Sequence, residues 1–120
     1  MEVLIIGPDN DINAMVETTI QRTPEHEFQH ALVKQAALDM IKDYPDIVLL
    51  DMDMPPDAIR EISAELQAKR IPVIAHSSEE FEHTMATNRE VRTAGFLKQP
   101  FDRRQVNNMI TSVLAASPEP

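Results

Sequence analysis

The sequence predicts an α/β domain, a doubly wound sheet of five parallel strands with helices on both faces. Short apolar runs alternate with segments of helical period along the chain, which is typical of successive βαβ units. The runs are hydrophobic at successive positions, as strands buried on both faces are. A length of 120 residues fits one domain. We place this domain at residues 1–116 and interpret residues 117–120, which hold two prolines, as a tail or the start of a linker.

The expected strands are the short apolar runs that end at turn signals. They lie at residues 3–6, 28–33, 47–50, 71–75 and 96–97. The run from Ile47 to Leu50 is the most β-prone of them and leads directly into Asp51. We therefore expect this run to be the central strand, with Asp51 at its carboxyl end.

Apolar residues at helical spacing predict five helices. They lie at residues 12–20, 37–44, 57–69, 79–93 and 106–114. Asn10 or Asp11 can cap the first, and Tyr44 is expected on the apolar side of the second. The fourth has few apolar anchors, which predicts a loosely attached, mostly polar helix. Asp102 and Gln105 have the spacing of a capping box before the last helix.

Charge and composition exclude several classes of function. The formal net charge is −9, from 20 acidic and 11 basic residues, so the long-range field repels nucleic-acid phosphates and anionic lipids. We expect no direct nucleic-acid binding and no membrane span, because no apolar run approaches the ~18 residues that crossing a bilayer needs. The chain has no cysteine and hence no thiol nucleophile. A cytoplasmic location is the expectation.

Candidate functional residues follow the ends of the predicted strands. In an open parallel sheet, ligands bind beyond the carboxyl ends of the strands, where loops and helix N-termini converge. The polar or conformationally special residues there are Gly7, Pro8, Asp9, Asp51, Asp53, Ser77, Lys98 and Gln99. We therefore expect the site at this edge of the sheet.

Across residues 2–115 the chain resembles the receiver domain of bacterial two-component response regulators, which has a flavodoxin-like (βα)5 fold. The most specific match is residues 45–55, PDIVLLDMDMP, a strand that ends in an aspartate followed by an Asp-x-x-Met-Pro turn. Residues 72–78, PVIAHSS, resemble the strand that ends in a hydroxyl residue. Residues 96–101, FLKQPF, are similar to the aromatic-Leu-x-Lys-Pro-Phe segment. Residues 3–12 match the opening strand and turn.

The resemblance implies a function and a set of roles. Asp51 would be the phosphoacceptor, attacking a phosphohistidine of a histidine kinase or phosphotransfer protein, with a divalent ion, usually Mg²⁺, bound. Ser77 and Phe96 would be the switch residues. The chain would signal to a downstream partner or output domain, with a homodimer through the face of helix four, strand five and helix five. The resemblance also implies a cis peptide bond between Gln99 and Pro100.

Three positions depart from the family's pattern. Gly7 and Pro8 stand where the family has an acidic pair that holds the metal, and Gln99 stands where it has a lysine. Lys98 lies one residue earlier, on the opposite face of the strand. The remaining metal candidates are Asp9, Asp51 and Asp53, a weak set of ligands for Mg²⁺, which requires near-octahedral oxygen coordination.

These departures leave two functions within the family. One is a receiver module with Asp51 as phosphoacceptor and a degenerate metal and lysine site, which is no enzyme beyond phosphoryl transfer to Asp51. The other is a pseudo-receiver that works without phosphorylation as an interaction or dimerisation domain. A third alternative is a phosphohydrolase of the haloacid-dehalogenase type, with Asp51 as nucleophile and Asp53 as general acid/base. We expect all four histidines to be surface or packing residues.

Overall fold

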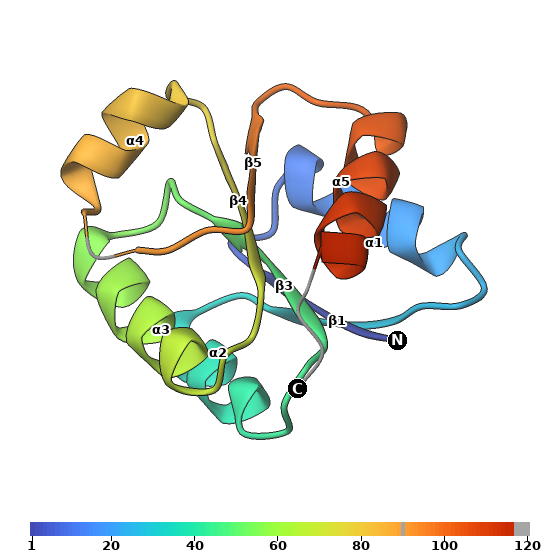
Figure 1. Ribbon diagram of the computed structural model, residues 1–120, viewed down its shortest axis with the longest axis horizontal. Coiled ribbons are helices and arrows are strands. Elements are labelled where there is room, and N and C mark those ends of the chain that lie inside the picture. The colour runs from blue at the N-terminus through green and yellow to red at the C-terminus, as the bar shows by residue number, and fades with distance from the viewer. Residues whose placement is uncertain (90, 117–120) are drawn as a thin grey trace.

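The computed structural model describes residues 1–89 and 91–116, which form one parallel sheet between two layers of helices (Figure 1). Five strands lie in the order β2-β1-β3-β4-β5, and every neighbouring pair is parallel. The predicted doubly wound, five-stranded parallel sheet of the flavodoxin-like type is confirmed. The proposed tail, residues 117–120, lies outside the described residues.

Strands and helices alternate strictly along the chain. The strands are β1 Glu2–Ile6, β2 Glu27–Ala31, β3 Ile47–Asp51, β4 Val73–Ser77 and β5 Gly95–Lys98. The helices are α1 Asp11–Gln21, α2 Lys34–Ile41, α3 Pro56–Ala68, α4 Phe81–Thr87 and α5 Arg103–Ala116. No described helix has the length and apolar character needed to cross a membrane.

Alternation of side chains along the strands divides the core into two halves. Leu4, Ile6, Val48 and Leu50 face α2 and α3, which cover one side of the sheet. The intervening residues of β1 and β3 face α1 and α5, which lie together on the other side (Figure 1). Both faces of β3 are therefore buried, and all five of its residues are inaccessible to solvent. This burial is why the strand is a continuous apolar run until Asp51.

Two predicted helix starts are confirmed. The Asn10 side chain accepts a hydrogen bond from the backbone N–H of Asn13 at 2.9 Å, so Asn10 is the N-cap of α1. At α5, Asp102 accepts from the N–H of Gln105, and the Gln105 side chain accepts from the N–H of Asp102, both at 2.9 Å. This reciprocal pair is the predicted capping box.

The predicted strand at residues 71–75 is wrong by two residues, since β4 runs from Val73 to Ser77. Arg70 has a φ of 56°, and the N–H of Ile71 donates to Leu66 O, so this segment closes the end of α3. The strand continues through His76 and Ser77 because these residues pair with β3 and β5.

The ends of three further elements also differ from the prediction. Helix α2 stops at Ile41, and Tyr44 is 61% exposed with a φ of 55° in the turn before Pro45. A residue before proline is disfavoured in a helix, which explains why Tyr44 does not pack on α2. Strand β2 ends at Ala31 rather than residue 33. Helix α4 covers seven residues, not the whole of 79–93, and Thr84 is its buried residue.

A core substitution tests the burial of β3. We expect Leu50→Ala to lower the free energy of unfolding by about 2–5 kcal/mol, because the side chain is fully buried between the sheet and α3. Urea denaturation measures the loss. Leu32→Ala, at a position 48% exposed, is the matched control and should change stability by less than about 1 kcal/mol. Equal losses in the two variants would contradict the packing described.

Candidate functional site

The candidate site lies where the strand order reverses, between β1 and β3 at the carboxyl edge of the sheet. Asp51 ends β3 and is 1% exposed. Gly7 follows β1 directly beside it, since a Cβ built on Gly7 would lie 2.7 Å from the Asp51 Cβ. Asp51 thus lies at the carboxyl end of β3, as expected.

Neutral donors hold the Asp51 carboxylate. The Asn13 side-chain Nδ2 donates to Oδ2 at 3.1 Å, and the backbone N–H of Asp53 donates to Oδ1 at 2.9 Å. Asn13 lies in the first turn of α1 and is fully buried. Sequence reasoning missed this residue. The sequence does carry one sign of it: Asn13 is a polar residue at helical spacing from Val16 and Ile20, on the face of α1 that packs on the sheet.

Gly7 is held from a second side by His30. The ring Nε2 of His30 donates to the carbonyl oxygen of Gly7 at 2.9 Å, and Nδ1 pairs with Glu17 Oε1 at 2.6 Å. The two ring nitrogens of His30 thus contact a side chain of α1 and the backbone at the end of β1. His30, expected to be a surface or packing residue, thus ties β2 to α1 and to the end of β1.

The side chains of Asp53 and Ser77 bind each other, and of these two residues only the backbone N–H of Asp53 contacts Asp51 in the described hydrogen bonds. The Ser77 hydroxyl donates to Asp53 Oδ1 at 2.7 Å and accepts from the N–H of Glu79 at 3.0 Å. The N–H of Ser78 donates to Asp53 Oδ2 at 3.1 Å. Asp53, although exposed, is therefore anchored to the end of β4. The hydroxyl of Ser77 thus both donates and accepts a hydrogen bond.

Gln99 turns toward the core. Its side-chain amide donates to Nδ1 of His76 at 2.9 Å, and His76 also packs edge-on against Phe101 with ring centroids 5.3 Å apart. The predicted cis bond between Gln99 and Pro100 is confirmed. Lys98 is exposed and donates to the carbonyl oxygen of Gln99 at 2.9 Å. The described contacts of Gln99 and Lys98 thus do not include Asp51.

His76 is a neutral, buried histidine. Burial lowers the pKa of His76 below its usual value, and the negative charges of Asp51 and Asp53 offset only part of that effect. The ring accepts at Nδ1 from Gln99, and its Nε2 has no hydrogen-bond partner within residues 1–89 and 91–116. The expectation that His76 packs is confirmed.

Phe96 lies on β5 and is half-buried. Its ring meets the ring of Phe81, at the start of α4, edge-on with centroids 5.2 Å apart. Phe81 is 46% exposed. The proposed switch aromatic thus forms a contact between the sheet and α4, on the side away from α1.

The residues present do not fit a metal centre. In the described part of the chain no three His, Cys, Asp or Glu side chains are grouped to hold a metal ion. Asp9 is exposed, Gly7 offers no side-chain ligand, and Pro8 has its carbonyl oxygen bound to Asn13 at 2.9 Å. Both oxygens of Asp51 already accept hydrogen bonds.

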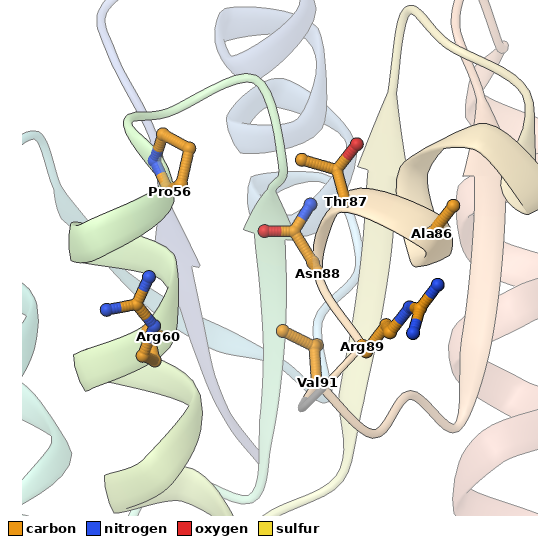
Figure 2. A pocket seen from close by; sticks show the side chains of 7 residues that line it. All are labelled: Pro56, Arg60, Ala86, Thr87, Asn88, Arg89 and Val91. Carbon is orange, nitrogen blue, oxygen red and sulfur yellow. The ribbon is translucent and has the colours of Figure 1, made fainter.

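A cavity of about 240 Å³ lies between α3 and α4, away from these residues (Figure 2). Pro56 and Arg60 border it from α3, and Thr87, Arg89 and Val91 from the other side. The guanidinium groups of Arg60 and Arg89 point in different directions in Figure 2 and do not converge on a common point. None of the candidate site residues lines it.

Comparisons with solved structures define the class of fold. The receiver domain of NtrX from Brucella abortus superposes with a TM-score of 0.78 at 22% identity, covering 96% of this chain and 99% of that one. The chemotaxis response regulator CheY4 of Vibrio cholerae gives 0.76 at 21% identity, covering 94% and 98%.

A third structure is the receiver domain of the sensor histidine kinase PA1611 from Pseudomonas aeruginosa, described with a magnesium ion coordinated in its active site cleft. It gives a TM-score of 0.76 at 21% identity, covering 96% of this chain and 98% of that one. No protein-family model matches the sequence, and no curated protein is significantly similar to it. The chain therefore has the fold of receiver domains over nearly its whole length.

Replacing Gly7 tests the close approach of β1 to Asp51. A Cβ at this position would lie 2.7 Å from both Asn13 Nδ2 and Asp51 Cβ, and the φ of 157° is unfavourable for other residues. We expect Gly7→Ala to lower the free energy of unfolding by about 1–3 kcal/mol, measured by urea denaturation. Gly95→Ala is the control, because its Cβ meets the flexible Met109 side chain, and it should cost less. A harmless Gly7→Ala would refute the crowding.

Burial of His76 predicts a loss of stability in acid. Because its pKa is lowered in the folded chain, the unfolded chain takes up a proton near pH 6.5 that the folded chain does not. The stabilising contribution is complete above this pH and declines as the pH falls below it. Urea titrations at several pH values should show a smaller decline in His76→Phe. His83→Gln, at an exposed position, should keep the decline, and identical profiles for all three proteins would oppose the assignment.

Proposed function

We propose that this chain is a receiver-type signalling module of a two-component system that works through protein contacts, without phosphorylation of Asp51. The observation that carries this proposal is the Asp51 carboxylate, which is 1% exposed and bound by the Asn13 amide and the Asp53 N–H. The receiver-type fold supports the signalling class. The state of Asp51 supports the phosphorylation-independent form of it.

Transfer of a phosphoryl group to Asp51 would require positive charge around the transferring group. Neither described hydrogen bond to Asp51 comes from a cation. Gln99 is bound to His76, and a neutral amide cannot cancel charge. Each lost electrostatic contact of this kind typically raises the barrier by ~2.7–4 kcal/mol, about a hundredfold or more in rate. Loss of two such contacts makes phosphotransfer very slow.

The proposed partners are proteins: a histidine kinase, a phosphotransfer protein, or a downstream output domain, in the cytoplasm. The net charge of −9 opposes direct contact with nucleic acid. The face of α4, β5 and α5, where Phe81 and Phe96 meet, is the proposed surface for a partner or for a second copy of the chain.

One observation favours the alternative of an active phosphoacceptor: Asp51 stands at the carboxyl edge beside the end of β1, with Ser77 on the adjacent strand β4. The phosphohydrolase alternative has less support. It requires Asp53 as a general acid/base, and the Asp53 carboxylate instead accepts from the Ser77 hydroxyl and the Ser78 N–H.

Incubation with acetyl phosphate and Mg²⁺, followed by intact-mass analysis, tests the proposal. We expect the chain to form no phosphoryl adduct within a time in which a receiver domain with a complete site is fully modified, a difference of about a hundredfold or more. Asp51→Asn is the control for the site of any adduct. An adduct that forms at the rate of the reference domain and disappears in Asp51→Asn would establish the active phosphoacceptor instead.

A further inference from the structure

We propose that the Asn13 amide occupies the position of a cation at Asp51, so that this one side chain makes the site independent of divalent metal. The proposal rests on the function proposed above, because it names the residue that keeps Asp51 in a neutral hydrogen-bond network. It concerns Asn13, a residue that the sequence pattern did not single out.

The orientation of the Asn13 amide is fixed by its partners. Nδ2 lies 2.9 Å from the carbonyl oxygen of Pro8 and 3.1 Å from Asp51 Oδ2, so both of its hydrogens have acceptors. A flipped amide would place Oδ1 against the same two oxygens, which is unfavourable. Asn13 is thus a double donor between β1 and β3, in the place where two oxygens converge.

The amide fills the space that a side chain at position 7 would enter. A Cβ on Gly7 would lie 2.7 Å from Asn13 Nδ2 and 3.2 Å from Asp51 Oδ2. The Asn13 side chain and a side chain at position 7, after the end of β1, therefore cannot occupy this space together. Because Gly7 has no side chain, the space beside it is open to the fully buried Asn13 side chain, which contacts Asp51 there.

The opposite face of the amide supports the same assignment. Asn13 Oδ1 is buried and has no hydrogen-bond partner among the described residues. An unpaired buried acceptor is costly, so the amide is held here by its two donor contacts in spite of this cost. The gain that compensates is the pairing of a buried carboxylate, which would otherwise lack a donor or a cation on Oδ2.

A carboxylate at position 13 should convert this neutral contact into a metal site. In Asn13→Asp, a side chain of the same shape brings a second carboxylate next to Asp51 Oδ2 and the Pro8 carbonyl. Three hard oxygens without a donor repel one another and are suitable ligands for Mg²⁺ or Mn²⁺. The wild-type chain, with the amide in place, should bind neither ion at this position.

Thermal unfolding with EDTA or with millimolar Mg²⁺ or Mn²⁺ tests the proposal. We expect an unchanged Tm in the wild type, and in Asn13→Asp a Tm lowered by roughly 5–10 °C in EDTA that rises by several degrees with either ion. Asn10→Asp is the matched control. It makes the same charge change on the same helix, keeps a good N-cap, and should show no ion-dependent shift.

Every outcome decides the proposal. Should Asn13→Asp be unfolded in EDTA, recovery of its circular dichroism on adding Mn²⁺ supports the proposal, and no recovery overturns it. An ion-dependent shift no larger than that of Asn10→Asp also overturns it, as does a comparable shift in the wild type. The readout is separate from phosphorylation, so an Asp51 adduct in the wild type would defeat the proposed function alone.

Discussion

The hydrogen bond between the Asn13 amide and the Asp51 carboxylate joins the first turn of α1 to the end of β3. The two residues can meet only because Gly7, between them at the end of β1, has no side chain. Asn10 caps α1 and so fixes where the helix begins, which places Asn13 in its first turn. The hydrogen bond to the buried Asp51 carboxylate thus depends on three residues close together in the sequence, Gly7, Asn10 and Asn13.

Much of the fold could be predicted because the strands of a parallel sheet are buried on both faces. A run as apolar as Ile47 to Leu50 fits a strand buried on both faces, which is where the structure places it. The capping box at Asp102 specifies a helix start by local hydrogen bonds alone. Prediction was wrong where tertiary pairing decides the boundary. His76 and Ser77 look like a turn in sequence, yet pairing with β3 and β5 on either side keeps them in β4.

The site could be located from sequence, but its contacts could not. Asp51, Ser77 and Gln99 each follow an apolar run, so their common edge follows from topology. Which of them touch depends on side-chain direction. Ser77 binds Asp53 and Gln99 binds His76, whereas the side chain described as binding Asp51 is Asn13, a residue 38 positions away on a helix. No spacing rule in the sequence encodes that pair.

Helix α4 differs from the other helices in how little it buries. It has seven residues with Thr84 inside, and its aromatic contact with Phe96 uses a ring that is 46% exposed. Moving this helix would give up little apolar area, whereas moving α1 would break the contact that holds Asp51. Displacing α4 should therefore cost less free energy than displacing α1.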